Sequence, residues 1–138
     1  MDPDVTDRSA RRLTIANLTR GTVLGDRIEV ADTSRTRNKG LLGRTGLPQG
    51  GGLWIVPCQS VHTFFMKFPL DLVYIDRQNR VKKVRRAVPA WRLSACLSAN
   101  SIVELPAGAI ERSRTAPGDQ LSFSDSPSPP QPDNGVAS

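Results

Sequence analysis

The chain has no long hydrophobic run. No stretch of its 138 residues approaches the ~18 consecutive apolar residues of a membrane-spanning helix, so we expect no membrane partner. Residues 1–7 are polar and acidic, whereas a secretory signal carries an apolar segment near its start. The sequence therefore predicts a cytoplasmic protein.

Aromatic residues, histidine and cysteine are all scarce. Aromatic side chains make up 5% of the chain, and no RNP-like motif or zinc finger accompanies them, so nucleic-acid binding is a weaker alternative. The one histidine is His62, and the two cysteines, Cys58 and Cys96, form no Cys-x-x-Cys pair. The usual zinc patterns are therefore absent, and we expect reduced thiols in a cytoplasmic protein.

Acidic residues are few in the middle of the chain. The net charge is +6, but residues 41–100 alone hold nine basic and two acidic residues, a net charge of +7. The segment 77–92 contains seven basic residues and no acidic one. Such a segment attracts phosphates and other anions. The alternative is a solvated basic surface without a ligand.

Short alternating or wholly apolar runs predict a mainly β (α+β) fold, a twisted antiparallel barrel-like sheet with two short helices. Residues 70–76 are apolar on both faces and belong in mid-sheet. Residues 81–88 carry basic doublets that suit an edge strand, after a turn in which Asn79 takes a positive φ. The predicted strands are 13–18, 28–31, 53–56, 62–66, 70–76, 81–88, 101–105 and 120–123.

Capping residues place the two helices. We expect the first to be capped within 32–34, to run through Leu42 and to stop at a left-handed Gly43. The second should open with Pro106 as its first residue and cover 107–114.

Glycine and proline also mark the connections and the ends. The glycine-rich segment 46–52 lacks the spacing and the lysine of a phosphate loop, so we expect a mobile connector there. We expect one β-rich domain at 13–123 between a flexible tail, 1–12, and a disordered Pro/Ser-rich tail, 124–138.

Five motifs occur in the order of a known family. They are 38–44 (NKGLLGR), 51–57 (GGLWIVP), 65–71 (FMKFPLD), 103–108 (VELPAG) and 118–119 (GD). With them, residues 33–123 resemble the uncharacterised prokaryotic family called domain of unknown function 192. The resemblance implies a compact β-rich domain and implies no reaction, cofactor or catalytic residue. The family's common Trp-Met-Lys-Asn-Thr is replaced by Phe-Met-Lys-Phe at 65–68, so no role of that Asn or Thr carries over.

Soft metal ligands form one candidate site. Cys58, His62 and Met66 lie four residues apart, and Cys96 is the other thiol. On a strand, His62 and Met66 share a face towards which Cys58 could fold back. Thiolate, imidazole and thioether suit copper(I) better than zinc, and the two thiols could instead form a redox site. The alternative is a purely structural role in the core, with no cofactor.

Two catalytic hypotheses are open, although a binding module is favoured over an enzyme. Cys58 could be the nucleophile of a Cys-His hydrolase with His62 as its base. Paired-carboxylate hydrolysis would use Asp71 with Glu104 or Asp76. The spacing of neither set shows that its groups meet.

The leading prediction is a small binding or accessory module for an anionic small molecule or polymer. Trp91 and Arg92 follow the basic strand, and an indole face beside a guanidinium can hold a base, a sugar phosphate or a carboxylate. Lys67 and Arg86 would add charge to the same groove. The alternative is that Trp91 plugs the open end of the barrel.

Overall fold

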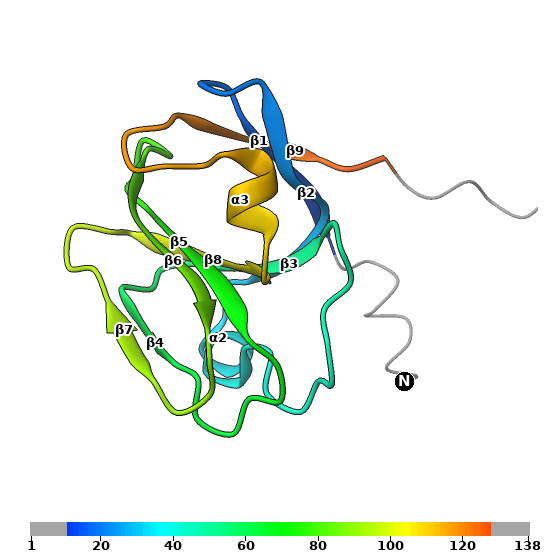
Figure 1. Cartoon of the computed structure of the whole chain (residues 1–138), viewed down its shortest axis with the longest axis vertical. Helices are drawn as coiled ribbons and strands as arrows, with labels where there is room; N and C mark the ends of the chain where they lie inside the picture. The colour runs from blue at the N-terminus through cyan, green and yellow to red at the C-terminus, as the bar shows by residue number, and fades with distance from the viewer. Residues whose placement is uncertain (1–10, 128–138) are drawn as a thin grey trace, which may run out of the picture.

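The structure is a computed structural model that describes residues 11–127. Most of the regular structure is β, and the two helices are short (Figure 1). The elements are β1 (Arg12–Asn17), β2 (Thr22–Ala31), α2 (Ser34–Lys39), β3 (Gly51–Ile55), β4 (Ser60–His62), β5 (Leu70–Ile75), β6 (Val81–Val88), β7 (Leu93–Ala95), β8 (Ser101–Pro106), α3 (Ala109–Ser113) and β9 (Leu121–Asp125).

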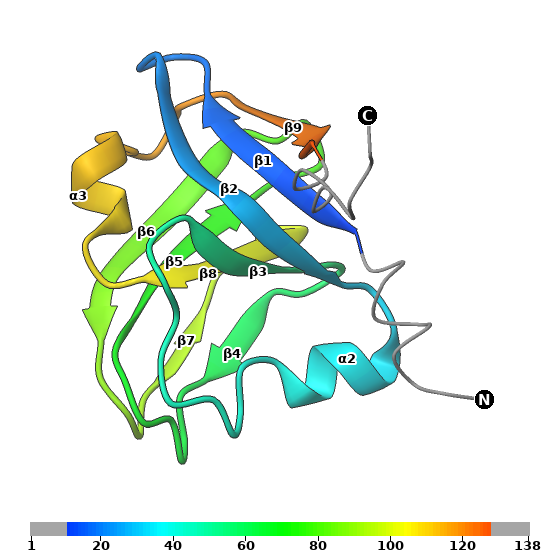
Figure 2. The ribbon, with the colours of Figure 1, turned by 90° about the vertical axis from the view of Figure 1, so that its right-hand side faces the viewer.

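Seven strands form one curled sheet in the order β6-β5-β8-β3-β2-β1-β9. All neighbours are antiparallel except β2 and β3. The two edge strands approach each other where Arg80 forms an isolated bridge with Gln120, so the sheet closes part of the way to a barrel (Figure 2). The predicted fold class, mainly β and barrel-like with two short helices, is confirmed.

The sheet separates two apolar cores, because neighbouring residues of its central strands point to opposite faces. Along β8, Val103 and Leu105 belong to the core that contains Ile110 of α3, whereas Ile102 belongs to the other. That other core contains Leu41, which follows α2. Every residue of β5 is buried, as predicted for a mid-sheet strand.

A second, two-stranded sheet pairs β4 with β7. Figure 2 places it at the same end of the molecule as α2. Tyr74 of β5 donates a 2.6 Å hydrogen bond to the hydroxyl of Ser94 in β7, which joins the small sheet to the large one.

The predicted basic edge strand is confirmed. β6 lies at one end of the large sheet, and Asn79 in the turn before it has φ 64°. The weaker strand predicted at 28–31 is also present, but β2 begins six residues earlier, at Thr22.

The strand predicted at 62–66 is wrong. β4 ends at His62, and the chain then turns, with Phe65 at φ 64° and the Met66 N–H donating to the carbonyl of Thr63. Thr63 is buried and its carbonyl also accepts from the N–H of Trp91, so these backbone groups stabilise a turn instead of a strand.

The glycine segment is only partly a connector. Gly51 and Gly52 are buried members of β3. A Cβ on Gly52 would lie 2.8 Å from the carbonyl oxygen of Glu104, so glycine permits close strand packing here.

Both helices differ from their predicted bounds. Thr33 caps α2 as expected, but the helix ends at Lys39, where Gly40 has a φ of 50°. Gly43 also has the predicted positive φ, of 87°, but it lies beyond the end of the helix. Pro106 is the last residue of β8 and does not open α3. The start of α3 is set from outside the helix, because one Asp71 carboxylate oxygen accepts the N–H groups of Gly108 and Ile110.

The ordered strands reach slightly beyond the expected domain. β1 starts at Arg12 and β9 ends at Asp125, because the edge strand keeps pairing with β1 up to Leu13 and Asp125. Residues 1–10 and 128–138 of the two predicted tails lie outside the described residues. Neither helix of residues 11–127 is long and apolar enough to cross a membrane.

Candidate functional sites

Two pockets lie on either side of the segment that follows β3. Pro57 and Cys58 line both of them. We call the larger one the Arg77–Lys82 cavity and the smaller one the Glu104 pocket, after the charged residues that distinguish them.

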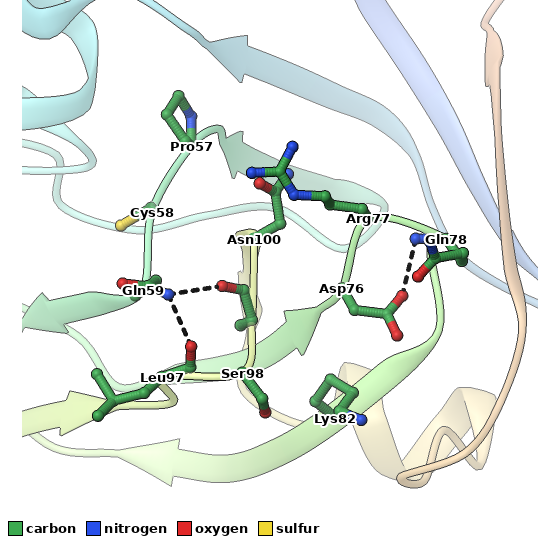
Figure 3. Close-up of a pocket in the computed structure, with 11 residues that line it drawn as sticks. Pro57, Cys58, Gln59, Asp76, Arg77, Gln78, Lys82, Leu97, Ser98 and Asn100 are labelled. Carbon is green, nitrogen blue, oxygen red and sulfur yellow. Dashed lines mark hydrogen bonds between the residues drawn. The ribbon is translucent and has the colours of Figure 1, made fainter.

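The Arg77–Lys82 cavity has a volume of about 740 Å³ and a mostly polar lining (Figure 3). One wall is shaped by Gln59, whose side-chain amide donates to the carbonyls of Leu97, at 2.7 Å, and Ala99, at 3.1 Å. The full lining is Pro57, Cys58, Gln59, Asp76, Arg77, Gln78, Lys82, Leu97, Ser98, Ala99 and Asn100.

Two cations and one carboxylate give this cavity its charge. Within the described residues, neither Arg77 nor Lys82 forms an ion pair. The Asp76 carboxylate holds the hairpin turn, since its Oδ1 accepts from the N–H groups of Gln78 and Arg80, both at 2.9 Å. The cations therefore remain available to a ligand.

The Glu104 pocket is smaller, about 240 Å³, and is covered by α2 and the residues after it. Glu104 pairs across the sheet with Leu53 of β3 and Leu72 of β5. Residues directly opposite each other share a face, so the carboxylate lies between two leucines on a wall of the pocket.

Glu104 is a buried acid without a compensating partner. Its side chain is 5% exposed, and Oε1 has no hydrogen-bond partner in the described structure. The positive charge of Arg44 attracts the Glu104 carboxylate. The Arg44 guanidinium is, however, bound at 2.9 and 3.1 Å to both carboxylate oxygens of Glu29. Burial raises the pKa of Glu104 to about 7, against the pull of Arg44.

Three of the four proposed soft ligands line this same pocket. Cys58, His62 and Met66 border it, whereas Cys96 does not. The Cys58 thiol donates to the carbonyl of Ser60 at 3.1 Å, and burial raises the pKa of that thiol. Both thiols are free.

The contacts of these residues are not those of an assembled catalytic or metal site. His62 accepts the N–H of Phe64 on Nδ1, and no described hydrogen bond joins it to Cys58. A raised thiol pKa disfavours the thiolate that a nucleophile needs. Among residues 11–127 there is no group of three His, Cys, Asp or Glu side chains arranged to hold a metal. Copper or zinc binding by this set stays a hypothesis.

The predicted groove residues lie elsewhere. Lys67, Arg86, Trp91 and Arg92 are exposed and line neither pocket. Trp91 stacks on Phe64 at 5.5 Å between ring centroids and is still 57% exposed, which does not fit a plug of the barrel. Arg92 bonds the carbonyls of Ala90 and Trp91.

Of the two predicted carboxylate pairs, Asp71 with Glu104 is wrong, and Asp71 with Asp76 stays a hypothesis. Asp71 lies opposite Leu105, and Glu104 lies opposite Leu72, so the pleat sends the two carboxylates to different faces of the sheet. Asp71 moreover accepts three backbone N–H groups, from Ala87, Gly108 and Ile110, which gives it a structural role.

Sequence reasoning missed the isolated position of Glu104 and the cavity beside Arg77 and Lys82. The sequence did contain a pattern that indicates the buried position of Glu104. Glu104 interrupts the apolar strand at the position that shares a face with Ile102, so a buried acid could have been inferred from alternation. The cavity depends on Gln59 and the 97–100 loop, which no local pattern connects to the hairpin.

Comparisons with known proteins agree with this fold. The family model DUF192, "Uncharacterized ACR", matches residues 15–123. UPF0127 proteins of Thermococcus sibiricus and Thermococcus gammatolerans are each 30% identical over 115 residues, which cover 79% of this chain and 73% and 74% of theirs.

Two solved bacterial structures share the architecture. A protein of Sinorhizobium meliloti, described as a candidate transcription regulator, has a TM-score of 0.72 at 19% identity and covers 83% of this chain and 94% of its own. A protein of unknown function from Novosphingobium aromaticivorans has a TM-score of 0.67 at 24% identity, over 80% of this chain and 82% of its own. At these identities the likeness concerns the fold alone.

Proposed function

This chain belongs to the uncharacterised DUF192 family, and from that premise we propose that it is a small binding protein that holds an anionic ligand in the Arg77–Lys82 cavity. The observation that supports this is the pair of cations, Arg77 and Lys82, that line one cavity without an ion pair in the described structure. The proposal keeps the anionic ligand expected from the basic segment and moves its site from Trp91 and Arg92 to the hairpin.

The lining supports a phosphate that also carries hydroxyl groups. A guanidinium and an ammonium that line the same cavity suit the charged oxygens of a phosphate or carboxylate. The carboxylate of Asp76 and the side-chain amides of Gln78 and Asn100 line the same cavity. The carboxylate can accept hydrogen bonds from ligand hydroxyl groups, and the amides can both accept and donate them. A volume of about 740 Å³ is within the range of small-molecule sites. A sugar phosphate is therefore the class of ligand that we propose.

Calorimetric titration with ribose 5-phosphate and with ribose tests the role of charge. The full chain should bind ribose 5-phosphate and bind ribose at least about tenfold more weakly, because only the phosphate makes charge-assisted hydrogen bonds. Arg77→Ala combined with Lys82→Ala should weaken ribose 5-phosphate binding by about a hundredfold, since two such contacts are removed.

The matched control is Arg86→Ala combined with Arg92→Ala. It removes the same charge from the same part of the chain but leaves the cavity lining intact. Affinity should change by less than about threefold in this control, through the weaker overall field alone. Loss of binding in the control and retention in the cavity variant would move the site back to the groove beside Trp91.

A further inference from the structure

The Glu104 pocket has the features of a binding site of its own. A buried carboxylate is costly unless a donor or a positive charge compensates it. Leu53 and Leu72 flank Glu104 within the sheet and provide neither. Arg44 is engaged by Glu29, so Glu104, whose buried Oε1 has no partner, lines a pocket whose occupant could complete the interactions of the carboxylate.

The helix that lines this pocket, α2, carries the opposite charge. Arg37 and Lys39, on α2, line it together with Asn38. The segment 33–70, which supplies α2 and β4, contains no Asp or Glu at all. The pocket thus has one acidic group in its buried wall and two basic residues on the covering helix.

From this arrangement we propose that the Glu104 pocket binds a small zwitterion of the amino-acid type, with its ammonium group on Glu104 and its anionic group towards Arg37 and Lys39. An ammonium group supplies both the donor and the positive charge that Oε1 lacks. A volume of about 240 Å³ restricts the ligand to a few heavy atoms besides its charged groups. The site is separate from the Arg77–Lys82 cavity and does not depend on it.

Binding of this kind should depend on pH through Glu104. The other titratable or charged side chains that face it are Arg37 and Lys39 from α2, Arg44 after the helix, Cys58, and His62 from β4. The ammonium group needs the ionised carboxylate, and burial raises the pKa of Glu104 to about 7. Affinity should therefore fall about tenfold per pH unit below that value.

Three probes of nearly equal size separate the two charges. β-Alanine has an ammonium and a carboxylate group, propionate has only the carboxylate, and propylamine has only the ammonium. We expect β-alanine to bind the full chain at pH 8, and each of the other two to bind at least about tenfold more weakly in calorimetric or ligand-observed NMR titrations. Equal binding of propionate and β-alanine would overturn the proposal. So would an absence of β-alanine binding up to about 50 mM, far above a millimolar Kd.

Glu104→Gln tests the residue itself, with Glu111→Gln on the exposed face of α3 as the control. Glu104→Gln should weaken β-alanine binding at least about tenfold and abolish the part of the pH dependence that belongs to this carboxyl, whereas the control should leave both unchanged. An unchanged affinity in a folded Glu104→Gln variant, as judged by its thermal unfolding, would refute the assignment.

Discussion

Glu104 is the residue at which stability and binding are opposed. Its neighbours across the sheet are leucines, and an apolar side chain would fit that face of β8 at lower electrostatic cost. The raised pKa means that the folded protein binds a proton more tightly than the unfolded chain does. The acid therefore weakens the fold whenever it is ionised.

The pH dependence of stability predicted from Glu104 is opposite to that of a salt-bridged carboxylate, which stabilises a protein as the pH rises. The pKa of Glu104 is about 7 in the folded state against an ordinary value of 4.5. Between these values the folded state holds more protons, so the free energy of unfolding should fall as the pH rises, by about 3 kcal/mol in all. Glu104→Gln should lack this decline. Urea unfolding of both proteins from pH 5 to pH 8 measures it, and parallel curves for the two proteins would contradict it.

At the scale of elements, β3 contains a glycine, Gly52, at a position that has no room for a side chain. Gly52→Ala should lower the free energy of unfolding by about 2 to 3 kcal/mol, because the new Cβ would overpack the sheet. It would lie 2.7 Å from the Ile28 side chain and 2.8 Å from the Glu104 carbonyl oxygen, and a backbone atom cannot move aside cheaply. Chemical denaturation gives the value.

Gly46→Ala provides the matched control for this substitution. A Cβ at Gly46 meets nothing within 4 Å, so its effect should stay within about 0.5 kcal/mol. Similar losses for both variants would mean that chain flexibility, and not close packing, sets the cost at Gly52.

Strands with a clear apolar pattern were the predictable part of the fold. β1 alternates, β5 is apolar on both faces, and both were expected from sequence. The three-residue strands β4 and β7 are too short to show any period, and their pairing links residues more than thirty positions apart. The start of α3 was misplaced for a related reason, since it depends on a carboxylate of β5, Asp71, that is distant in sequence.

The candidate sites were predictable only in part. The spacing of Cys58, His62 and Met66 indicated a shared location, and all three border one pocket. The geometry of that location was wrong, because the chain turns after His62. Cys96 donates its backbone N–H to the carbonyl of Gln59 but lies outside the lining of the Glu104 pocket, a distinction that spacing cannot make.

At the scale of the whole molecule, one buried side-chain hydrogen bond joins the two sheets. The hydroxyls of Tyr74 and Ser94 are 2.6 Å apart and buried. The exposed Nζ of Lys83 adds a bond to the carbonyl of Ala95, also in β7. Pocket walls from β4 and from β8 keep their relative positions only while the small sheet stays docked.

Tyr74→Phe should therefore loosen the small sheet before the large one. It leaves the Ser94 hydroxyl buried without its partner, at a cost of about 1 to 3 kcal/mol. Amide hydrogen exchange in β7 should accelerate more than in β5. Adding Ser94→Ala should recover part of the loss, because both polar groups are then gone. Uniform acceleration across both sheets would show that the contact does not act locally.

The pairing of β1 with β9 also determines how the domain would respond to mechanical force. Leu13 lies opposite Asp125, and the N–H of Ser126 donates to the carbonyl of Arg12, so the first and last strands leave the sheet at one corner. Tension between these two points would act on the hydrogen bonds between the antiparallel strands β1 and β9 one pair at a time. β9 is an edge strand, so it would peel away first and separate Phe123 from Trp54, whose rings are 4.6 Å apart. A tether at this corner would thus unzip the fold from its final strand, while the strands around Glu104 stayed paired.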